Sequence, residues 1–406
     1  MGESEGRSPS DKIVPVFSTR VPDDRRPSRL ARAVADARSR GPVIDLTLSN
    51  PTRAGIEYPP GLLAALSDPA ALTYRPAALG LRDAREAVAA DYARRGLRLD
   101  ADRIVLTSST SEAYSIVFKL LCEPGASAVL TPVPSYPLFD HLTRLDGIAQ
   151  QRYALEYHGA WTVDWDGLDR AWTAATRAVL AVSPNNPTGS IVSAAEADEF
   201  TRRCAARDAA LILDEVFADY PLGPAGEEAA AFVRPPCLVF RLGGLSKSIG
   251  LPQVKLGWIA VDGPDDLVAE ALDRLELICD TYLSVSTPVQ VAARSLLERG
   301  AAVRGQILER VRANDAALRA MVAASAASHG TTVLPADGGW SAVVRVPATL
   351  SEEALAIELA EQDAVLVHPG YFFDFPHEAF LVVSLLPAPG DFARGVKLVQ
   401  DRIHAA

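Results

Sequence analysis

The chain has 406 residues, of which 49% are apolar and 22% are charged, and its formal net charge is −11 at pH 7. This length favours two domains around a shared cleft, and the composition is that of a globular protein. The negative charge argues against a binding surface for nucleic acid or for an anionic membrane, because both need a basic face. It leaves room for a small phosphate-bearing ligand, which a helix N-terminus and a few cations can bind.

The four cysteines are far apart in the sequence and form no CxxC pair: Cys122, Cys204, Cys237 and Cys279. We therefore expect free thiols, and neither a metal centre nor a disulfide framework. Residues 1–12 are polar and lack the apolar segment of a secretory signal. No apolar run approaches the ~18 residues that a membrane span needs, so we expect a cytoplasmic protein.

The first forty residues show no clear periodicity and predict a mobile arm followed by a short helix near 27–39. From about residue 61, helical segments begin to alternate with apolar, β-type segments. The first helix of this region has one apolar face and a glycine that would end it: Leu81, Ala84, Val88, Tyr92 and Gly96.

Six short, nearly continuous apolar runs follow, as expected for strands that are buried on both faces. They are Ile104–Thr107, Ala128–Thr131, Ala178–Val182, Ala210–Leu213, Leu238–Arg241 and Leu256–Val261. Helical segments lie between several of them, notably at Ser111–Cys122 and Ala194–Arg207. This alternation predicts an α/β fold with a large domain built on a mostly parallel sheet flanked by helices.

After Pro288 the pattern changes, which indicates a smaller α+β domain. It predicts a long amphipathic helix at Ala302–Ala323, a strand at Trp340–Val346 and a helix at Glu352–Glu361. The predicted division is an N-terminal arm with part of the small domain at 1–60, a large domain at 61–287 and a small C-terminal domain at 288–406.

Polar clusters follow four of the predicted strands, and open α/β sheets bind ligands at these carboxyl ends. The first, at 108–112 (SSTSE), opens a helix and is either a phosphate site or only an N-cap with a nearby acid. The second, at 183–189 (SPNNPTG), either presents two amides rigidly or is only a tight loop. The third, at 214–217 (DEVF), contains an acid that either faces a cleft or caps the next turn.

The fourth cluster contains Ser246 and Lys247, and Lys255 follows eight residues later. Only five of the 40 Lys and Arg residues are lysines, so two lysines within nine residues are notable. A lysine amine can lose its proton and attack a carbonyl, whereas an arginine stays charged at ordinary pH. Apolar residues and glycines surround both lysines, which argues against two ordinary surface lysines.

In order and spacing these clusters resemble the class I/II aminotransferases, aspartate-aminotransferase-like enzymes of pyridoxal 5'-phosphate (PLP) fold type I, from about Leu46 to the C-terminus. The resemblance implies that Lys247 holds PLP as a Schiff base, Asp214 pairs with the pyridinium nitrogen and Asn186 donates to the phenolic oxygen. It assigns the remaining cofactor contacts to Ser109, Thr110, Ser111, Ser246 and Lys255 at the phosphate, and to Tyr136 and Phe217 at the ring.

The resemblance also implies a homodimer with shared active sites. Tyr74 is similar to a tyrosine that reaches the neighbouring subunit's phosphate, and Ser284 and Ser286 lie in a stretch similar to one that completes the partner's site.

Several positions depart from the family pattern. Phe217 stands where the family has a tyrosine that bonds the phenolic oxygen, so we expect weaker stabilisation of the phenolate unless Tyr220 reaches it. Gly244 stands where a serine is frequent, and Lys255 replaces a bidentate arginine with a point charge. We expect a lower cofactor affinity, for which Ser246 could compensate.

The family's C-terminal arginine, which binds the substrate α-carboxylate, is also missing, and the equivalent stretch at 380–385 reads FLVVSL. Either another arginine binds the carboxylate (Arg53, Arg75 or Arg345), or the substrate lacks one at this place. We expect an atypical amine or amino-acid substrate, with contacts from Asn50, Arg53, Trp340 and Tyr371, the last in the 368–371 stretch (HPGY) that resembles a loop near the substrate.

Transamination between a small-molecule amino donor, which is an amino acid or amine, and a keto-acid acceptor is the first expectation, because Lys247, Asp214 and Asn186 support it directly. The same scaffold would also suit a Cβ–S lyase or another α,β-elimination enzyme, and a non-catalytic PLP-binding module is the third alternative. The presence of Lys247, the residue that would bind PLP covalently, argues against a catalytically inactive protein. We expect no DNA-binding domain of the kind that aminotransferase-like regulators carry, because the first forty residues given are polar and too few for one.

Overall fold

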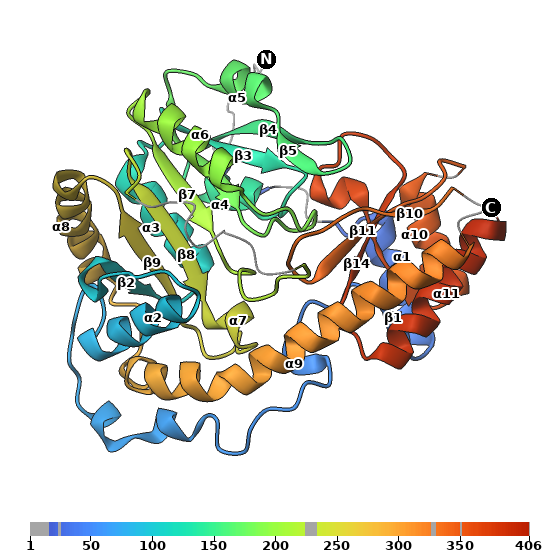
Figure 1. The fold of residues 1–406 in the computed structure, drawn as a ribbon, viewed down its shortest axis with the longest axis horizontal. Coiled ribbons are helices and arrows are strands. Elements are labelled where there is room, and N and C mark those ends of the chain that lie inside the picture. Colours follow the sequence, from blue (N-terminus) through green and yellow to red (C-terminus); the bar gives the residue numbers. More distant parts are fainter. Residues whose placement is uncertain (1–15, 23–25, 224–233, 326–329, 350, 406) are drawn as a thin grey trace, which may run out of the picture.

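A computed structural model describes residues 16–22, 26–223, 234–325, 330–349 and 351–405. The chain forms a large sheet and a smaller antiparallel sheet, which a long helix connects (Figure 1). The first fifteen residues of the predicted arm lie outside the described part. The helix predicted near 27–39 is α1 (Arg29–Arg40), and the Ser28 hydroxyl caps it by accepting a hydrogen bond from the Ala31 amide (3.1 Å).

The large sheet has eight strands in the order β2-β9-β8-β7-β6-β3-β4-β5. Their bounds are β2 Ile104–Thr107, β3 Ala128–Val133, β4 Ala149–Tyr157, β5 Trp161–Val163, β6 Thr176–Val182, β7 Ala210–Asp214, β8 Val239–Gly244 and β9 Gly257–Asp262. Strands β4, β3, β6, β7 and β8 are parallel, β9 is antiparallel to both of its neighbours, and β5 is antiparallel to β4. The predicted α/β fold with a mostly parallel sheet is therefore confirmed.

Helices bury both faces of this sheet, which explains the continuous apolar runs. Leu180 of β6 packs in one cluster with Val117 of α3 (Thr110–Leu121), and α8 (Asp265–Tyr282) covers the same face. Its neighbour Val179 points the other way and packs with Phe200 of α6 (Ala194–Ala205), beside α5 (Trp165–Ala171). The remaining helices of this region are α2 (Arg82–Arg94), α4 (Phe139–Leu145) and α7 (Leu245–Ser248).

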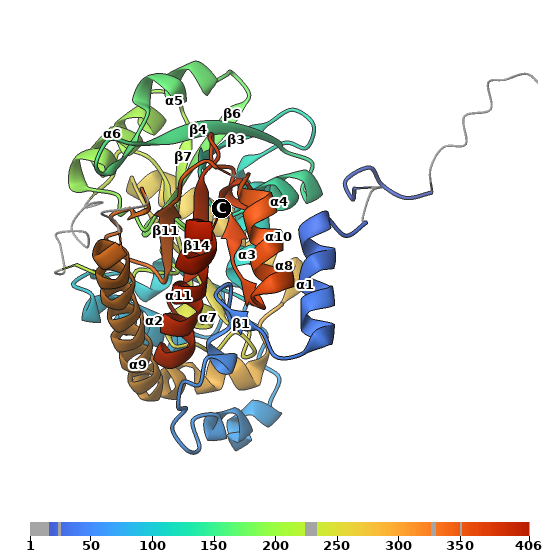
Figure 2. The same ribbon diagram turned by 90° about the vertical axis from the view of Figure 1, so that its right-hand side faces the viewer.

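The small sheet has the order β10-β11-β14-β13 and is antiparallel throughout. Its region comprises β10 Thr332–Val333, β11 Ser341–Arg345, α10 Glu352–Gln362, β13 His368–Pro369, β14 Phe380–Ser384 and α11 Pro389–Ala405. The N-terminal segment joins it because β1 (Ile44–Asp45) pairs with β12 (Val365–Leu366), and α1 lies alongside α10 (Figure 2). The exact domain limits stay a prediction. Short 3-10 helices occupy Pro51–Arg53, Ala64–Ser67, Pro69–Leu72, Ala101–Arg103 and Gly370–Phe373.

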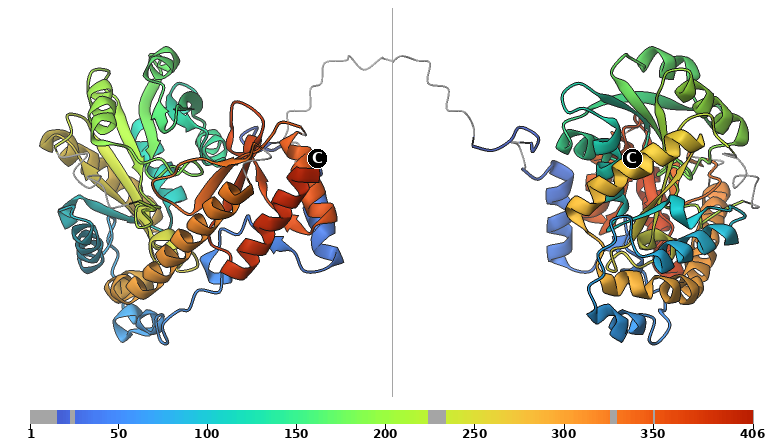
Figure 3. Two further views of the ribbon diagram at one scale, coloured as in Figure 1. Left: turned by 45° about the vertical axis from the view of Figure 1, so that its right-hand side comes forward. Right: turned by 90° about the vertical axis from the view of Figure 1, so that its left-hand side faces the viewer.

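Helix α9 (Thr287–Ser325) has 39 residues, so it is about 58 Å long. It packs against α2 in the large region and against α11 in the small one (Figure 3). The predicted start at Ala302 was wrong: Pro288 lies in the first turn, where a helix tolerates proline, and the helix continues through Gly300 and Gly305. Tertiary packing thus outweighs the poor helix propensity of these two glycines.

Within the described part of the chain, every helix is too short or too polar to span a lipid bilayer. The four cysteines are free and buried.

Gly300 and Gly305 share one helix but have different surroundings. A Cβ at Gly300 would lie 2.8 Å from side-chain carbons of Ile249, whereas a Cβ at Gly305 meets nothing within 4 Å. We expect Gly305→Ala to raise the free energy of unfolding by ~0.5–1 kcal/mol through helix propensity. We expect Gly300→Ala to lower it by about 1–3 kcal/mol through overpacking. Denaturant unfolding measures both, and equal stabilisation would show that α9 does not pack closely against Ile249.

Candidate active site

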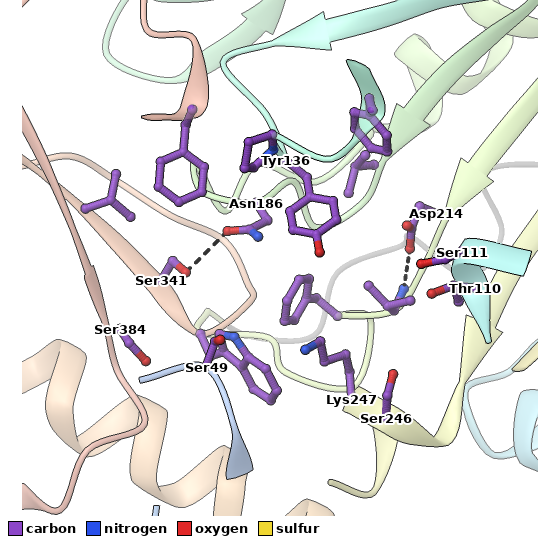
Figure 4. Close-up of a pocket in the computed structure, with 18 of the residues that line it drawn as sticks. Ser49, Thr110, Ser111, Tyr136, Asn186, Asp214, Ser246, Lys247, Ser341 and Ser384 are labelled. Atoms are coloured by element: carbon purple, nitrogen blue, oxygen red, sulfur yellow. Dashed lines mark hydrogen bonds between the residues drawn. The ribbon is translucent and has the colours of Figure 1, made fainter. Parts of the chain in front are cut away.

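A cavity of about 360 Å³ lies where β6, β7 and β8 end, between the large sheet and the small sheet (Figure 4). Most residues that the resemblance assigns to the cofactor line it, together with one residue assigned to the substrate: Thr110, Ser111, Tyr136, Asn186, Asp214, Phe217, Ser246, Lys247 and Trp340. The structure thus brings together side chains that are up to about 230 residues apart in the sequence.

The N-terminus of α3 forms one end of the cavity. The Ser109 hydroxyl accepts from the Glu112 amide (3.1 Å), and the Glu112 carboxylate accepts from the Ser108 amide (2.6 Å). Ser109 is therefore the N-cap, while Thr110 and Ser111 expose their polar groups to the cavity. Free N–H groups of a first helical turn beside two hydroxyls make an anion site, so the cap and the phosphate interpretations are compatible.

A glycine at the start of β9 lets this turn lie against the sheet. A Cβ on Gly257 would lie 2.8 Å from the carbonyl carbon of Ser109 and 3.0 Å from the amide nitrogen of Thr110. Lys255, two residues earlier, is exposed at a positive φ of 62° and does not line the cavity. Its proposed contact with the phosphate stays a prediction.

Asp214 ends β7 and is only 7% exposed. Its Oδ2 accepts from the Tyr114 hydroxyl (2.6 Å) and its Oδ1 from the Val216 amide (3.0 Å), so the acid both faces the cavity and caps the next turn. Burial raises the pKa of Asp214 to about 6, although both hydrogen bonds and the positive charge of Lys247 oppose the rise. Such a carboxylate gains most from a cationic partner within the cavity.

Lys247 lies in the short helix α7, directly after β8, and its amine lines the cavity. Burial lowers the pKa of Lys247, and the negative charge of Asp214 opposes the change. The Nζ atom lies 5.0 Å from the centre of the Trp340 ring. A lowered pKa increases the fraction of neutral amine, which is the form that attacks a carbonyl.

The two amides of the 183–189 turn have separate roles. Asn185 is buried and bonded within the protein: its Nδ2 donates to the carbonyl of Pro134 (3.0 Å) and its Oδ1 accepts from the Ser135 hydroxyl (2.8 Å). Asn186 lines the cavity, and its Oδ1 accepts from the Ser341 hydroxyl (3.4 Å). Among the described residues its amide nitrogen has no hydrogen-bond partner, so this nitrogen can donate to a ligand.

Aromatic side chains form much of the remaining wall. Phe217 packs edge-on against Trp340, with ring centres 5.0 Å apart, and Tyr136 packs edge-on against Phe139 at 5.9 Å. Tyr220 does not substitute for the missing tyrosine in this structure, because its hydroxyl donates to the backbone carbonyls of Lys247 and Ser248 behind the cavity.

The stretch that lacks the arginine forms part of the cavity wall. It is β14 with its continuation, and Val382 and Ser384 line the cavity beside His368 and Phe372. None of the described residues that line the cavity is an arginine. Arg53, Arg75 and Arg345 are exposed and lie outside the lining.

Several proposed contacts are not at the cavity. The Asn50 side chain accepts from the amide (3.1 Å) and hydroxyl (2.7 Å) of Thr52, which caps the Pro51–Arg53 turn. Tyr371 is 43% exposed, while the next residue, Phe372, lines the cavity in its place. Tyr74 is 71% exposed and lies beside Ser284 in a separate shallow pocket.

Sequence reasoning missed some residues of the cavity. Tyr114 lies four residues after Thr110 in α3, so helical spacing could have placed it near the same end. Thr47, Ser49, Ser341 and Ser384 carried no such signal, because only the pairing of distant strands brings them together.

Comparisons with known proteins agree with this geometry. The family model described as "Aminotransferase class I and II" matches residues 47–389. Alanine aminotransferase of Mycobacterium tuberculosis is 25% identical over 364 residues, 87% of this chain and 84% of the relative. Glutamate-pyruvate aminotransferase AlaA of Escherichia coli is 26% identical over 258 residues, 63% of each.

Solved structures show the same fold. Alanine aminotransferase from Pyrococcus furiosus superposes with a TM-score of 0.82 at 18% identity, covering 93% of this chain and 96% of that one. A mutant aspartate aminotransferase of Thermus thermophilus gives 0.81 at 19% identity, covering 95% and 99%. The family match over most of the chain confirms the resemblance seen in the sequence. The chain therefore belongs to the aminotransferase class I and II family and is a PLP-dependent aminotransferase.

Proposed function

We propose that this chain catalyses transamination with PLP held by Lys247, between a small amino donor that is atypical for the family and a carbonyl acceptor. The observation that supports this best is the shared cavity of Lys247, Asp214 and Asn186 at the ends of neighbouring strands. These three side chains supply an amine, a buried acid and an amide donor within one site.

The residues present fit this cofactor. Thr110, Ser111 and Ser246 would hold the phosphate at the N-terminus of α3, and Tyr136 would pack on the ring. Asp214, whose pKa is raised by burial, would be stabilised in its ionised form by a protonated ring nitrogen. The free amide nitrogen of Asn186 would donate to the phenolic oxygen.

When bound, PLP supplies an aldehyde that takes up the amino group and a ring that stabilises negative charge on the donor carbon. Lys247 would hold the cofactor through its amine, and the same amine would move a proton at the donor carbon, first as base and then as acid. Burial suits it to this role, because it lowers the pKa of the amine towards neutrality. The Trp340 ring, whose centre lies 5.0 Å from Nζ, covers one side of this amine.

We also propose a homodimer in which Tyr74 reaches the partner's phosphate site. Tyr74 is 71% exposed and lies outside the cavity of its own chain, and nearby Leu72 is 90% exposed. Both side chains would be better packed against a second copy. A cytoplasmic location stays a prediction from the sequence.

A spectral and product assay distinguishes transamination from elimination. We expect an amino donor to convert the visible absorption of the loaded enzyme to that of the pyridoxamine 5'-phosphate form, with one carbonyl product per site and no free ammonia. Addition of a carbonyl acceptor should restore the original spectrum. Release of ammonia and pyruvate from a cysteine conjugate, without any acceptor, would instead show a Cβ–S lyase.

Asp214→Asn should affect stability and catalysis in opposite directions. The folded-state pKa of Asp214 is raised from 3.8 to about 6, so the cofactor-free fold loses stability as the pH rises through this range. At neutral pH the ionised carboxylate costs about 3 kcal/mol, and an asparagine can still bond Tyr114 and Val216.

We therefore expect the cofactor-free variant to unfold at a higher denaturant concentration than wild type at neutral pH, with no difference below pH 3.8. The loaded variant should transaminate at least about 100-fold more slowly, because the ring nitrogen has lost its acid partner. A variant that keeps wild-type turnover would show that Asp214 does not act on the cofactor.

A further inference from the structure

The cavity end opposite the α3 N-terminus is rich in hydroxyl groups. Ser49, Ser341 and Ser384 lie at this end, from the N-terminal segment and from β11 and β14 (Figure 4), and Thr47 also lines the cavity. Apart from Lys247, no lysine or arginine lines any part of the cavity among the described residues. This end is therefore polar but has no fixed cation.

Three of these hydroxyls already donate their only proton to the protein. Thr47 donates to the Asp45 carboxylate (2.5 Å), and Ser384 donates to the backbone carbonyl of Leu48 (2.6 Å). Ser341 donates to the Oδ1 atom of Asn186 (3.4 Å). These three groups can offer a ligand lone pairs but no proton, and Ser384 has one lone pair left because it also accepts from the Leu386 amide (3.2 Å). Ser49 and the free amide nitrogen of Asn186 can still donate, so the end offers neutral hydrogen-bond partners of both kinds and no cation.

His368 does not supply the missing positive charge. Burial lowers the pKa of His368, although the nearby Asp45 carboxylate opposes the change. Its ring stacks on Phe372, with ring centres 4.8 Å apart and planes 8° apart. On the same wall Val382 pairs with His368 across the sheet, and Val382 is 2% exposed. A neutral ring and an aliphatic side chain thus stand where a carboxylate would need cations.

We propose that the amino donor is a primary amine whose amino-bearing carbon carries a hydroxymethyl or similar uncharged, hydrogen-donating group in place of a carboxylate. This inference rests on the proposed function and names its substrate class as amino alcohols. The donor hydroxyl gives its proton to the remaining lone pair of Ser384 or to Thr47. A carboxylate at the same place would be desolvated without a counter-ion.

The half-reaction balances without a further reagent. The amino group and two electrons leave the donor carbon, which becomes a carbonyl with oxygen from water, and the cofactor aldehyde becomes a primary amine. Because the acceptor binds at the same place, it is also an uncharged hydroxy-aldehyde or hydroxy-ketone. Reactions that supply or consume this enzyme's substrates therefore handle amino alcohols and hydroxycarbonyl compounds.

Donor pairs that differ only at this group test the inference with the loaded wild-type enzyme. We would compare L-alaninol with L-alanine, and L-phenylalaninol with L-phenylalanine, by the rate at which each converts the visible absorption in a single turnover. We expect each amino alcohol to react at least about 100-fold faster than its amino acid, because the carboxylate stays unpaired.

Amino acids that react as fast as their alcohols, or faster, would overturn the inference and leave transamination standing. If Arg75→Ala then abolished the amino-acid reaction, the missing cation would be the partner's Arg75. If no donor of either kind changed the spectrum of an enzyme that holds the cofactor, the proposed function and the inference would both fail.

A cation placed in the wall provides an independent check. Val382→Arg should reverse the preference by at least about 10-fold towards the amino acid, because the guanidinium can pair with the carboxylate. The matched variant Val382→Leu, which adds volume without charge, should still prefer the amino alcohol. If the amino alcohol and the amino acid of each pair reacted at equal rates, in wild type and in Val382→Arg alike, this end of the cavity would not select the donor.

Discussion

A carboxylate buried at the end of a strand costs free energy unless hydrogen-bond donors and a cation face it. Asp214 meets these conditions only in part: Tyr114 and Val216 donate to it, and burial still raises its pKa to about 6. Lys247 faces the same cavity, and burial lowers the pKa of its amine. Burial makes the charged forms of both groups unfavourable. A cofactor with an aldehyde and a basic ring nitrogen would relieve this, because the aldehyde reacts with the amine and the protonated nitrogen pairs with the carboxylate.

The fold could be predicted wherever burial left a clear pattern. The apolar runs of β6, β7 and β8 are buried on both faces and were visible as strands. Strand β4 was missed, because most of its residues are partly exposed and its sequence AQQRYALEY has no apolar run. The first half of α9 was missed because Gly300 suits a close approach to Ile249, a contact that no local pattern reveals.

The cofactor end of the site could be predicted because its residues follow strands directly, so chain order specifies their place. The opposite end could not, since Ser341 and Ser384 come together only through the pairing of β11 with β14. The sequence did show that the arginine was absent from 380–385, but only the structure places Val382 in the wall of the cavity. Asn50 and Tyr371 are sequence neighbours of the lining residues Ser49 and Phe372, but they do not line the cavity themselves. The Asn50 side chain bonds Thr52, and Tyr371 lies in a 3-10 helix and is 43% exposed.

Borohydride reduction of the PLP-loaded protein, followed by digestion and mass spectrometry, tests the central claim most directly. Reduction makes the bond between the cofactor and its lysine permanent, and the other four lysines serve as internal controls. We predict a single pyridoxyl-labelled peptide that contains Lys247, with Lys255 unlabelled. An unlabelled Lys247, or a label on any other lysine alone, would contradict the assignment of this site.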